Sequence, residues 1–84
     1  MIVEFTETAK KEFLSLDKSQ QIQFKKALDK LKDYSSQKHL NYGIPAFVIK
    51  VNKQARIIYN QLENTILVLH CFAKHDDYER WYKT

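Results

Sequence analysis

The sequence predicts a single α+β domain with the element order β-α-α-β-β-β. Apolar residues recur at helical spacing before residue 34 and at strand spacing after residue 45. The one glycine and the one proline, Gly43 and Pro45, both lie between these two halves. We therefore expect an antiparallel sheet that is covered by an N-terminal helical hairpin and followed by a short C-terminal helix or tail.

The first half of the chain predicts one strand and two helices. Met1 to Phe5 has the β-branched and aromatic side chains of a short strand, and Thr6 or Thr8 can cap a first helix. Asp17 and Gln20 have the spacing of a capping box and open a second helix after a tight break. The apolar stripe of this second helix consists of Phe24, Ala27, Leu28 and Leu31.

The second half predicts three strands, which follow a loop from Tyr34 to Pro45. The strands are expected at Ala46–Val51, Ala55–Gln61 and Thr65–Phe72. Their connections are short enough for hairpin loops, so the three strands should form an antiparallel meander. The polar end of the chain has the spacing of one helical face at Tyr78, Trp81 and Tyr82.

Composition excludes several classes of protein. The chain has 84 residues, of which 44% are hydrophobic and 29% charged, as expected for one globular domain over residues 1–84. One glycine is too few for a Walker loop or a dinucleotide-binding fingerprint. A lone Cys71 excludes an internal disulfide framework and multi-cysteine zinc modules. The longest apolar runs, such as Ile66 to Leu69, are too short to span a membrane, so we expect a cytoplasmic protein.

The charge balance favours an anionic partner. Fourteen basic and ten acidic side chains give a net charge of +4, spread evenly over the two halves of the chain. An excess of this kind favours nucleic acid or acidic proteins through encounter rate and non-specific affinity.

Two strand sequences match the patterns of a known family most closely, FVIKV at 47–51 and ARIIY at 55–59. They correspond to a Y-x-[IL]-[RK]-V strand and a Y-R-[IL]-[IV]-Y strand joined by a hairpin turn. The opening VEFTETAKK, the break LSLDK with the helix after it, and the ending VLH with KHDDY also match in the same order. On these segments, nearly the whole chain resembles the RelE/ParE superfamily, the toxins of type II toxin–antitoxin pairs.

This resemblance implies a function as well as a fold. One branch of the family cleaves mRNA in the ribosomal A site without a metal or other cofactor, and another branch inhibits DNA gyrase. A third possibility is an inactive member that only binds an antitoxin. In all three cases an acidic or amphipathic segment of a cognate antitoxin protein would bind the basic, groove-bearing surface. The expected function is a ribosome-dependent mRNA endoribonuclease, with the gyrase inhibitor as the alternative.

Cleavage of RNA without a metal needs a cluster of cations and a group that exchanges a proton. Lys50 interrupts an apolar strand, and Arg56 is one of only two arginines. If their strands pair, both side chains can project from one sheet face, where a guanidinium can bind phosphate through two hydrogen bonds. The resemblance places both residues at basic positions of the family's active site. Alternatively, Lys50 is a strand lysine that points to solvent.

Lys74, His75 and Tyr78 form a second candidate cluster. An imidazole titrates near neutral pH and suits a general acid or base. The resemblance aligns Tyr78 with the tyrosine that ends the family motif, where a phenol can orient the 2′-OH or stack on a base. The alternative is that these C-terminal aromatics only pack on the domain. His70 and Cys71 are interpreted as structural, and the histidine spacing predicts no metal site.

Two departures from the family pattern weaken the predicted cluster. Val48 occupies a position that is often basic in the nuclease branch, and Lys74-His75 replaces an arginine that often follows the last strand. Loss of a bidentate arginine costs about 1–3 kcal/mol in the transition state. A slower or differently specific nuclease and a gyrase inhibitor therefore both stay open.

Overall fold

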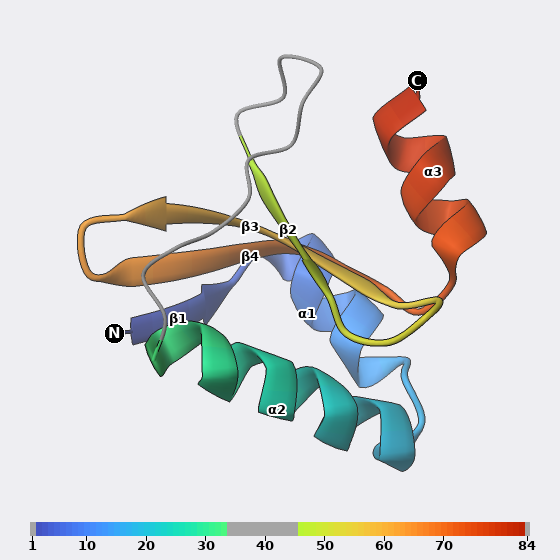
Figure 1. The fold of residues 1–84 in the computed structure, drawn as a ribbon, viewed down its shortest axis with the longest axis horizontal. Coiled ribbons are helices and arrows are strands. Elements are labelled where there is room, and N and C mark those ends of the chain that lie inside the picture. Colours follow the sequence, from blue (N-terminus) through green and yellow to red (C-terminus); the bar gives the residue numbers. More distant parts are fainter. Residues whose placement is uncertain (1, 34–45, 84) are drawn as a thin grey trace.

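The structure, a computed structural model, describes residues 2–33 and 46–83, so the predicted loop from Tyr34 to Pro45 lies outside the described residues. The element order confirms the predicted fold class, including the short C-terminal helix (Figure 1). The elements are β1 (Ile2–Phe5), α1 (Glu7–Leu14), α2 (Lys18–Asp33), β2 (Phe47–Lys50), β3 (Arg56–Leu62), β4 (Thr65–Phe72) and α3 (His75–Lys83).

The four strands form one sheet in the order β1-β4-β3-β2. The predicted meander is confirmed, because β3 pairs antiparallel with both β2 and β4. The first strand differs, since β1 pairs with β4 in parallel and makes the sheet mixed. Both helices and two strands separate β1 from β4 in the chain, which is the long crossover that parallel pairing requires.

Local hydrogen bonds fix where the first two helices begin. The Thr6 hydroxyl accepts from the backbone N–H of Ala9 at 3.1 Å, so Thr6 is the N-cap of α1. At the start of α2, the Asp17 Oδ1 accepts from the Gln20 N–H at 2.8 Å, and the Gln20 Oε1 accepts from the Asp17 N–H at 3.2 Å. The predicted capping box is therefore confirmed.

The larger core lies between the sheet and the pair of helices α1 and α2. Alternate residues of each strand enter it, and a β-bulge between Ile58 and Tyr59 shifts the alternation, so that Val68 and Cys71 of β4 both join this core. The fully buried side chains include Phe24 of α2 and Tyr59 of β3. Both aromatics are therefore core residues.

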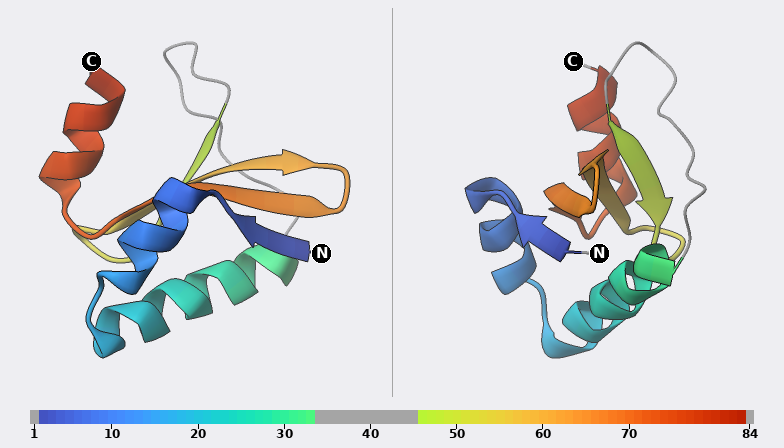
Figure 2. Two further views of the ribbon diagram at one scale, coloured as in Figure 1. Left: turned by 180° about the vertical axis from the view of Figure 1, so that it is seen from behind. Right: turned by 90° about the vertical axis from the view of Figure 1, so that its left-hand side faces the viewer.

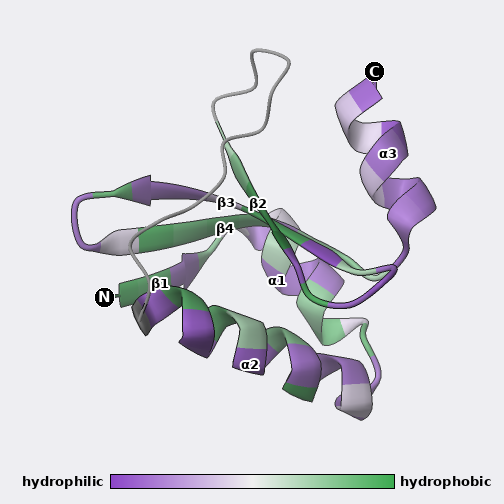
Figure 3. Cartoon of the chain, viewed as in Figure 1, coloured by the Kyte–Doolittle hydropathy of each residue, from purple (hydrophilic) through white to green (hydrophobic). Residues whose placement is uncertain are grey.

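The opposite face of the sheet carries a smaller core under α3. Figure 2 shows α3 separated from α2 by the sheet. The buried residues on this face are Ala46, Ile58 and Phe72, and Tyr78 and Trp81 of α3 pack on their edge. Figure 3 shows that α3 is mainly hydrophilic, and none of its residues is fully buried. No helix in the described part of the chain combines the length and apolar character that crossing a membrane requires.

Candidate functional site

Two cations lie opposite each other at the end of the β2–β3 hairpin. Lys50 is the register partner of Arg56, so both side chains leave the sheet on the same face. This is the face that α3 partly covers, because Ile58, two residues after Arg56, lies in the core under α3. Like charges in directly opposed positions repel each other. An anion placed between the two side chains would remove that repulsion.

The hairpin brings Arg56 to the C-terminal helix. Its guanidinium carbon lies 5.8 Å from the ring centroid of Tyr78, which is a cation–π distance. The His75 ring meets the Tyr78 ring edge-on, with 5.6 Å between centroids. Three of the five residues predicted from the sequence therefore touch in series, and Lys50 joins them through its pairing with Arg56.

The His75 ring is oriented by a carboxylate of its own helix. Its Nδ1 lies 3.0 Å from the Glu79 Oε1, one helical turn away. Because a carboxylate only accepts hydrogen bonds, Nδ1 carries the proton in this contact, and Nε2 is left to accept or donate one. The hydrogen bond from Lys83 lowers the pKa of Glu79, and His75 adds to this effect, which keeps the carboxylate ionised. The i,i+4 spacing of His75 and Glu79 is the sequence signal for this pair.

Lys74, the fifth predicted site residue, lies immediately before α3. Its carbonyl accepts from the backbone N–H of Tyr78, so Lys74 precedes the first turn of α3, and its side chain is exposed. The helix start is also held by the β2–β3 turn, since the Gln54 Oε1 accepts from the His75 N–H at 3.3 Å. Gln54 was not among the candidates from the sequence, and only its position beside a tight turn hints at such a role.

His70 and Cys71 have structural surroundings, in line with their interpretation from the sequence. Glu12 of α1 accepts a hydrogen bond from the Cys71 N–H at 2.9 Å, and its carboxylate lies 3.3 Å from the His70 Nδ1. The His70 ring also stacks on Phe72, with 4.8 Å between centroids. Burial, together with the negative charge of Glu12, raises the pKa of the Cys71 thiol to about 12, so the thiolate is not available near neutral pH.

One group of side chains has the composition of a metal site. His75, Asp76 and Glu79 each place one potential ligand atom within 4.8 Å of the others. The Glu79 carboxylate already pairs with both His75 and Lys83, at 3.0 and 2.7 Å. The Glu79 carboxylate therefore already has partners within its own helix. We treat the group as an ion-pair network of α3 rather than as a metal centre.

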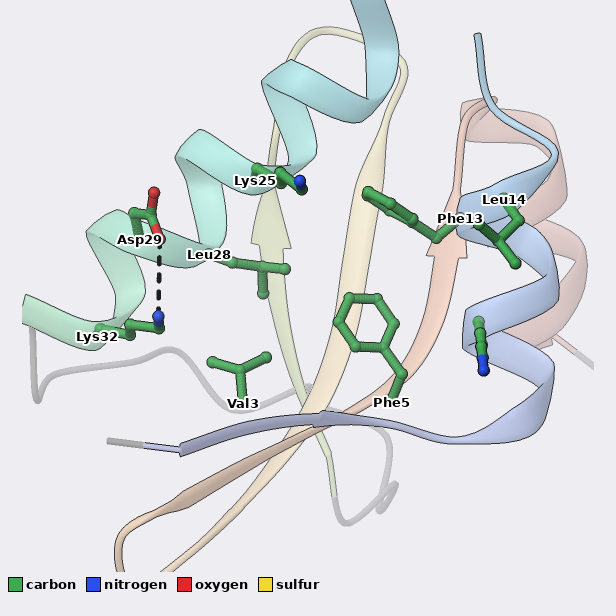
Figure 4. Close-up of a pocket in the computed structure, with 9 residues that line it drawn as sticks. Val3, Phe5, Phe13, Leu14, Lys25, Leu28, Asp29 and Lys32 are labelled. Atoms are coloured by element: carbon green, nitrogen blue, oxygen red, sulfur yellow. Dashed lines mark ion pairs between the residues drawn. The ribbon is translucent and has the colours of Figure 1, made fainter. Parts of the chain in front are cut away.

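A groove lies on the other side of the sheet, where β1, α1 and α2 meet, and has a volume of about 440 Å³ (Figure 4). Its apolar lining consists of Val3, Phe5, Phe13, Leu14 and Leu28. Its polar lining consists of Lys10, Lys25, Lys32 and Asp29. Asp29 pairs with Lys32 at 3.8 Å, so the charge that the groove presents is mainly positive. The groove is therefore apolar inside with a basic margin.

Comparisons with known proteins identify the fold. No protein-family model and no curated protein sequence matches the chain. Among solved structures, the intact RelBE toxin–antitoxin complex of E. coli contains a similar chain, with a TM-score of 0.73 and 22% identity over 84% of this chain and 93% of that one. The YoeB dimer of Staphylococcus aureus has a TM-score of 0.71 and 15% identity over 86% and 94%.

The isolated RelE toxin of E. coli gives the most complete alignment of these three structures. It has a TM-score of 0.71 and 21% identity, covering 98% of this chain and 95% of that one. This third alignment covers nearly the whole chain, and identities of this size support a likeness of the fold alone. The resemblance seen in the sequence is confirmed at the level of the fold: this chain has the RelE/ParE toxin fold.

Proposed function

We propose that the protein is the toxin of a type II toxin–antitoxin system and acts as a ribosome-dependent mRNA endoribonuclease in the cytoplasm. The observation that supports this best is the pairing of Lys50 with Arg56 on the sheet face where Tyr78 and His75 lie. RNA cleavage without a metal needs cations and a group that exchanges a proton, and this face offers two cations, an imidazole and a phenol.

Each group has a chemical role in this proposal. Arg56 binds the scissile phosphate and stabilises the charge that develops on its oxygens, and Lys50 adds a second cation. The Nε2 atom of His75 exchanges the proton, since Nδ1 is held by Glu79. Tyr78 orients the 2′-OH or stacks on a base, and its ring keeps the Arg56 guanidinium in place. Lys74 contributes positive charge at the margin of the site.

The two arginines of the chain provide a matched test. Arg56 lies at the site, whereas Arg80 is exposed on α3 and pairs with Asp77 at 3.2 Å. We expect new mRNA 5′ ends in a translating extract with the wild type and with Arg80→Ala. With Arg56→Ala these ends should form about two orders of magnitude more slowly, because no other residue at the site offers a bidentate cation. Primer extension on a defined message measures the ends.

The same experiment separates the alternatives. The gyrase inhibitor is an alternative because Val48 takes a position that is often basic in the nuclease branch. Val48 packs against the small core under α3. A toxic wild type that leaves the message intact would contradict the nuclease, and gyrase-dependent DNA breaks would then support the inhibitor of DNA gyrase. A chain that is neither toxic nor cleaves RNA would be an inactive member that binds an antitoxin.

We propose further that the groove between β1, α1 and α2 binds an acidic, amphipathic segment of the cognate antitoxin. The RelE-like chain of E. coli was solved in a toxin–antitoxin complex, which makes an antitoxin the natural partner. Apolar side chains at helical spacing would fill the groove, and acidic ones would meet Lys10, Lys25 and Lys32. Antitoxin binding would then also cover the 63% exposed Leu14.

Two exposed leucines make this partner proposal testable. Leu14 lines the groove, whereas Leu62 lies at the end of β3, outside the groove, and is 74% exposed. The protein encoded beside this chain would be co-expressed with it, and the affinity measured by titration calorimetry. Leu14→Glu should weaken binding about tenfold or more, since it places a buried charge in the interface, and Leu62→Glu should not. Equal affinities for the two variants would place the antitoxin elsewhere.

A further inference from the structure

The turn between β2 and β3 is held by a side chain rather than by a glycine. The Asn52 Oδ1 accepts hydrogen bonds from the backbone N–H groups of Gln54 and Ala55, both at 2.9 Å. The Val51 N–H donates to the Ala55 carbonyl at 3.0 Å and closes the hairpin. Asn52 thus fixes the path of the backbone immediately before Arg56.

This backbone path determines where the Arg56 guanidinium lies. Its Nη1 donates to the carbonyl oxygens of Asn52 and Ala55, both at 2.9 Å, and lies 3.3 Å from that of Lys53. The carbonyls of one turn therefore surround one end of the guanidinium. Within the described residues, every side-chain hydrogen bond of Arg56 goes through Nη1. The Nη2 and Nε donors form the other edge, which has the fork geometry that binds a phosphate.

We propose that Asn52 is a positioning residue for Arg56: by fixing the turn, it directs the Nη2–Nε edge of the guanidinium toward the scissile phosphate. This inference rests on the proposed nuclease function, because it assigns Arg56 a phosphate to bind. The turn has a second anchor, since the Asn52 Nδ2 donates to the Gln23 Oε1 of α2 at 2.8 Å. The orientation of the cation is thereby connected to the helices on the far side of the sheet.

Three variants separate the two hydrogen-bonding roles of Asn52. Asn52→Ala removes both, Asn52→Ser keeps an acceptor for the turn, and Gln23→Ala removes only the contact with α2. We expect the rate of mRNA cleavage at saturating ribosomes to fall about tenfold for Asn52→Ala, because a displaced guanidinium loses most of its benefit in the transition state. Asn52→Ser should stay within about threefold of the wild type, and Gln23→Ala should be close to it.

A double variant tests whether Asn52 acts through Arg56. If it does, Asn52→Ala should slow cleavage about tenfold in the wild type and have no further effect in the Arg56→Ala background. An additional tenfold loss in that background would overturn the inference, as would an Asn52→Ala variant as fast as the wild type. Thermal melting of each variant checks that the loss is not a loss of the fold.

Nuclear magnetic resonance keeps the inference testable if the wild type cleaves no RNA, a result that would contradict only the proposed function. Held by carbonyls, the Arg56 Nη1 protons should give resolved signals in the wild type and in Asn52→Ser. In Asn52→Ala, rotation of the freed guanidinium should merge them. Resolved Nη1 signals in Asn52→Ala would show that the turn holds Arg56 without Asn52 and would overturn the proposal.

Discussion

The two faces of the sheet differ in how completely they are covered. On one face, α1 and α2 enclose a core that includes Phe24 and Tyr59, which are almost fully buried. On the other face, α3 covers only Ile58 and two neighbours, and its own residues stay partly exposed. The candidate site residues lie on this second face. We infer that the first face supplies most of the stability and that the second leaves room for a substrate.

The same division appears in how charge is distributed. Polar contacts on the first face are structural, as with Glu12, which accepts from the Cys71 N–H. On the second face, Lys50 and Arg56 lie opposite each other without a carboxylate between them among the described residues. Repulsion of this kind costs a little stability and is relieved by an anion. The main core and the Lys50–Arg56 pair therefore lie on different sides of one sheet.

The largest expected effect is a loss of stability from the first face. Phe24→Ala should lower the free energy of unfolding by about 3–5 kcal/mol, because it leaves a cavity where the buried Phe24 ring was packed. For a domain of this size that is a large part of the total stability. Urea denaturation followed by circular dichroism measures it. A loss below about 1 kcal/mol would show that the helices contribute less than their burial indicates.

The second face should tolerate a similar truncation better. Trp81→Ala removes a partly exposed ring that packs on Phe72, with 5.9 Å between centroids. We expect a loss of about 1–2 kcal/mol, since less apolar area is taken from the core. A loss as large as that of Phe24→Ala, measured in the same urea titration, would remove the difference between the two faces.

A smaller effect of opposite sign is expected at Tyr59. Its hydroxyl is buried and has no hydrogen-bond partner in the described part of the chain. Tyr59→Phe should therefore raise the free energy of unfolding by about 1 kcal/mol at pH 7. A loss of stability in the urea titration would instead indicate that the hydroxyl is satisfied in solution.

Alkaline pH gives an independent readout of the same hydroxyl. Burial raises the pKa of Tyr59 from 10.0 to about 12, so the unfolded chain releases this proton at lower pH than the folded one. Ionisation of Tyr59 therefore leaves the free energy of unfolding unchanged below pH 10 and lowers it, by at most about 3 kcal/mol, as the pH rises toward 12. Tyr59→Phe should lack this part of the decline and keep the part due to Cys71. Parallel stability curves for both proteins would contradict the assignment.

Local sequence signals predicted much of the fold. The Thr6 cap and the capping box of Asp17 and Gln20 depend on residues within one turn of each other, and the structure has both. The parallel pairing of β1 with β4 and the bulge at Ile58/Tyr59 arise from contacts between distant segments. Strand alternation alone contains no information on them.

The sequence indicated the candidate site residues themselves but not the residues that hold them in position. Lys50 and Arg56 stood out as cations in apolar strands, and the hairpin pairing that joins them followed from the short turn. The roles of Asn52 and Gln54 depend on where the turn meets Arg56 and α3. Those contacts are set by tertiary packing, and neither residue has an unusual sequence context.

Arg56 is proposed to act in cleavage and to contribute little to the stability of the fold. The most direct measurement combines the rate of mRNA cleavage and the free energy of unfolding for Arg56→Ala, with Arg80→Ala as the control. We predict that cleavage by Arg56→Ala is slower by about two orders of magnitude, while its stability stays within about 0.5 kcal/mol of the wild type. Cleavage at the wild-type rate by a folded Arg56→Ala variant would contradict this account.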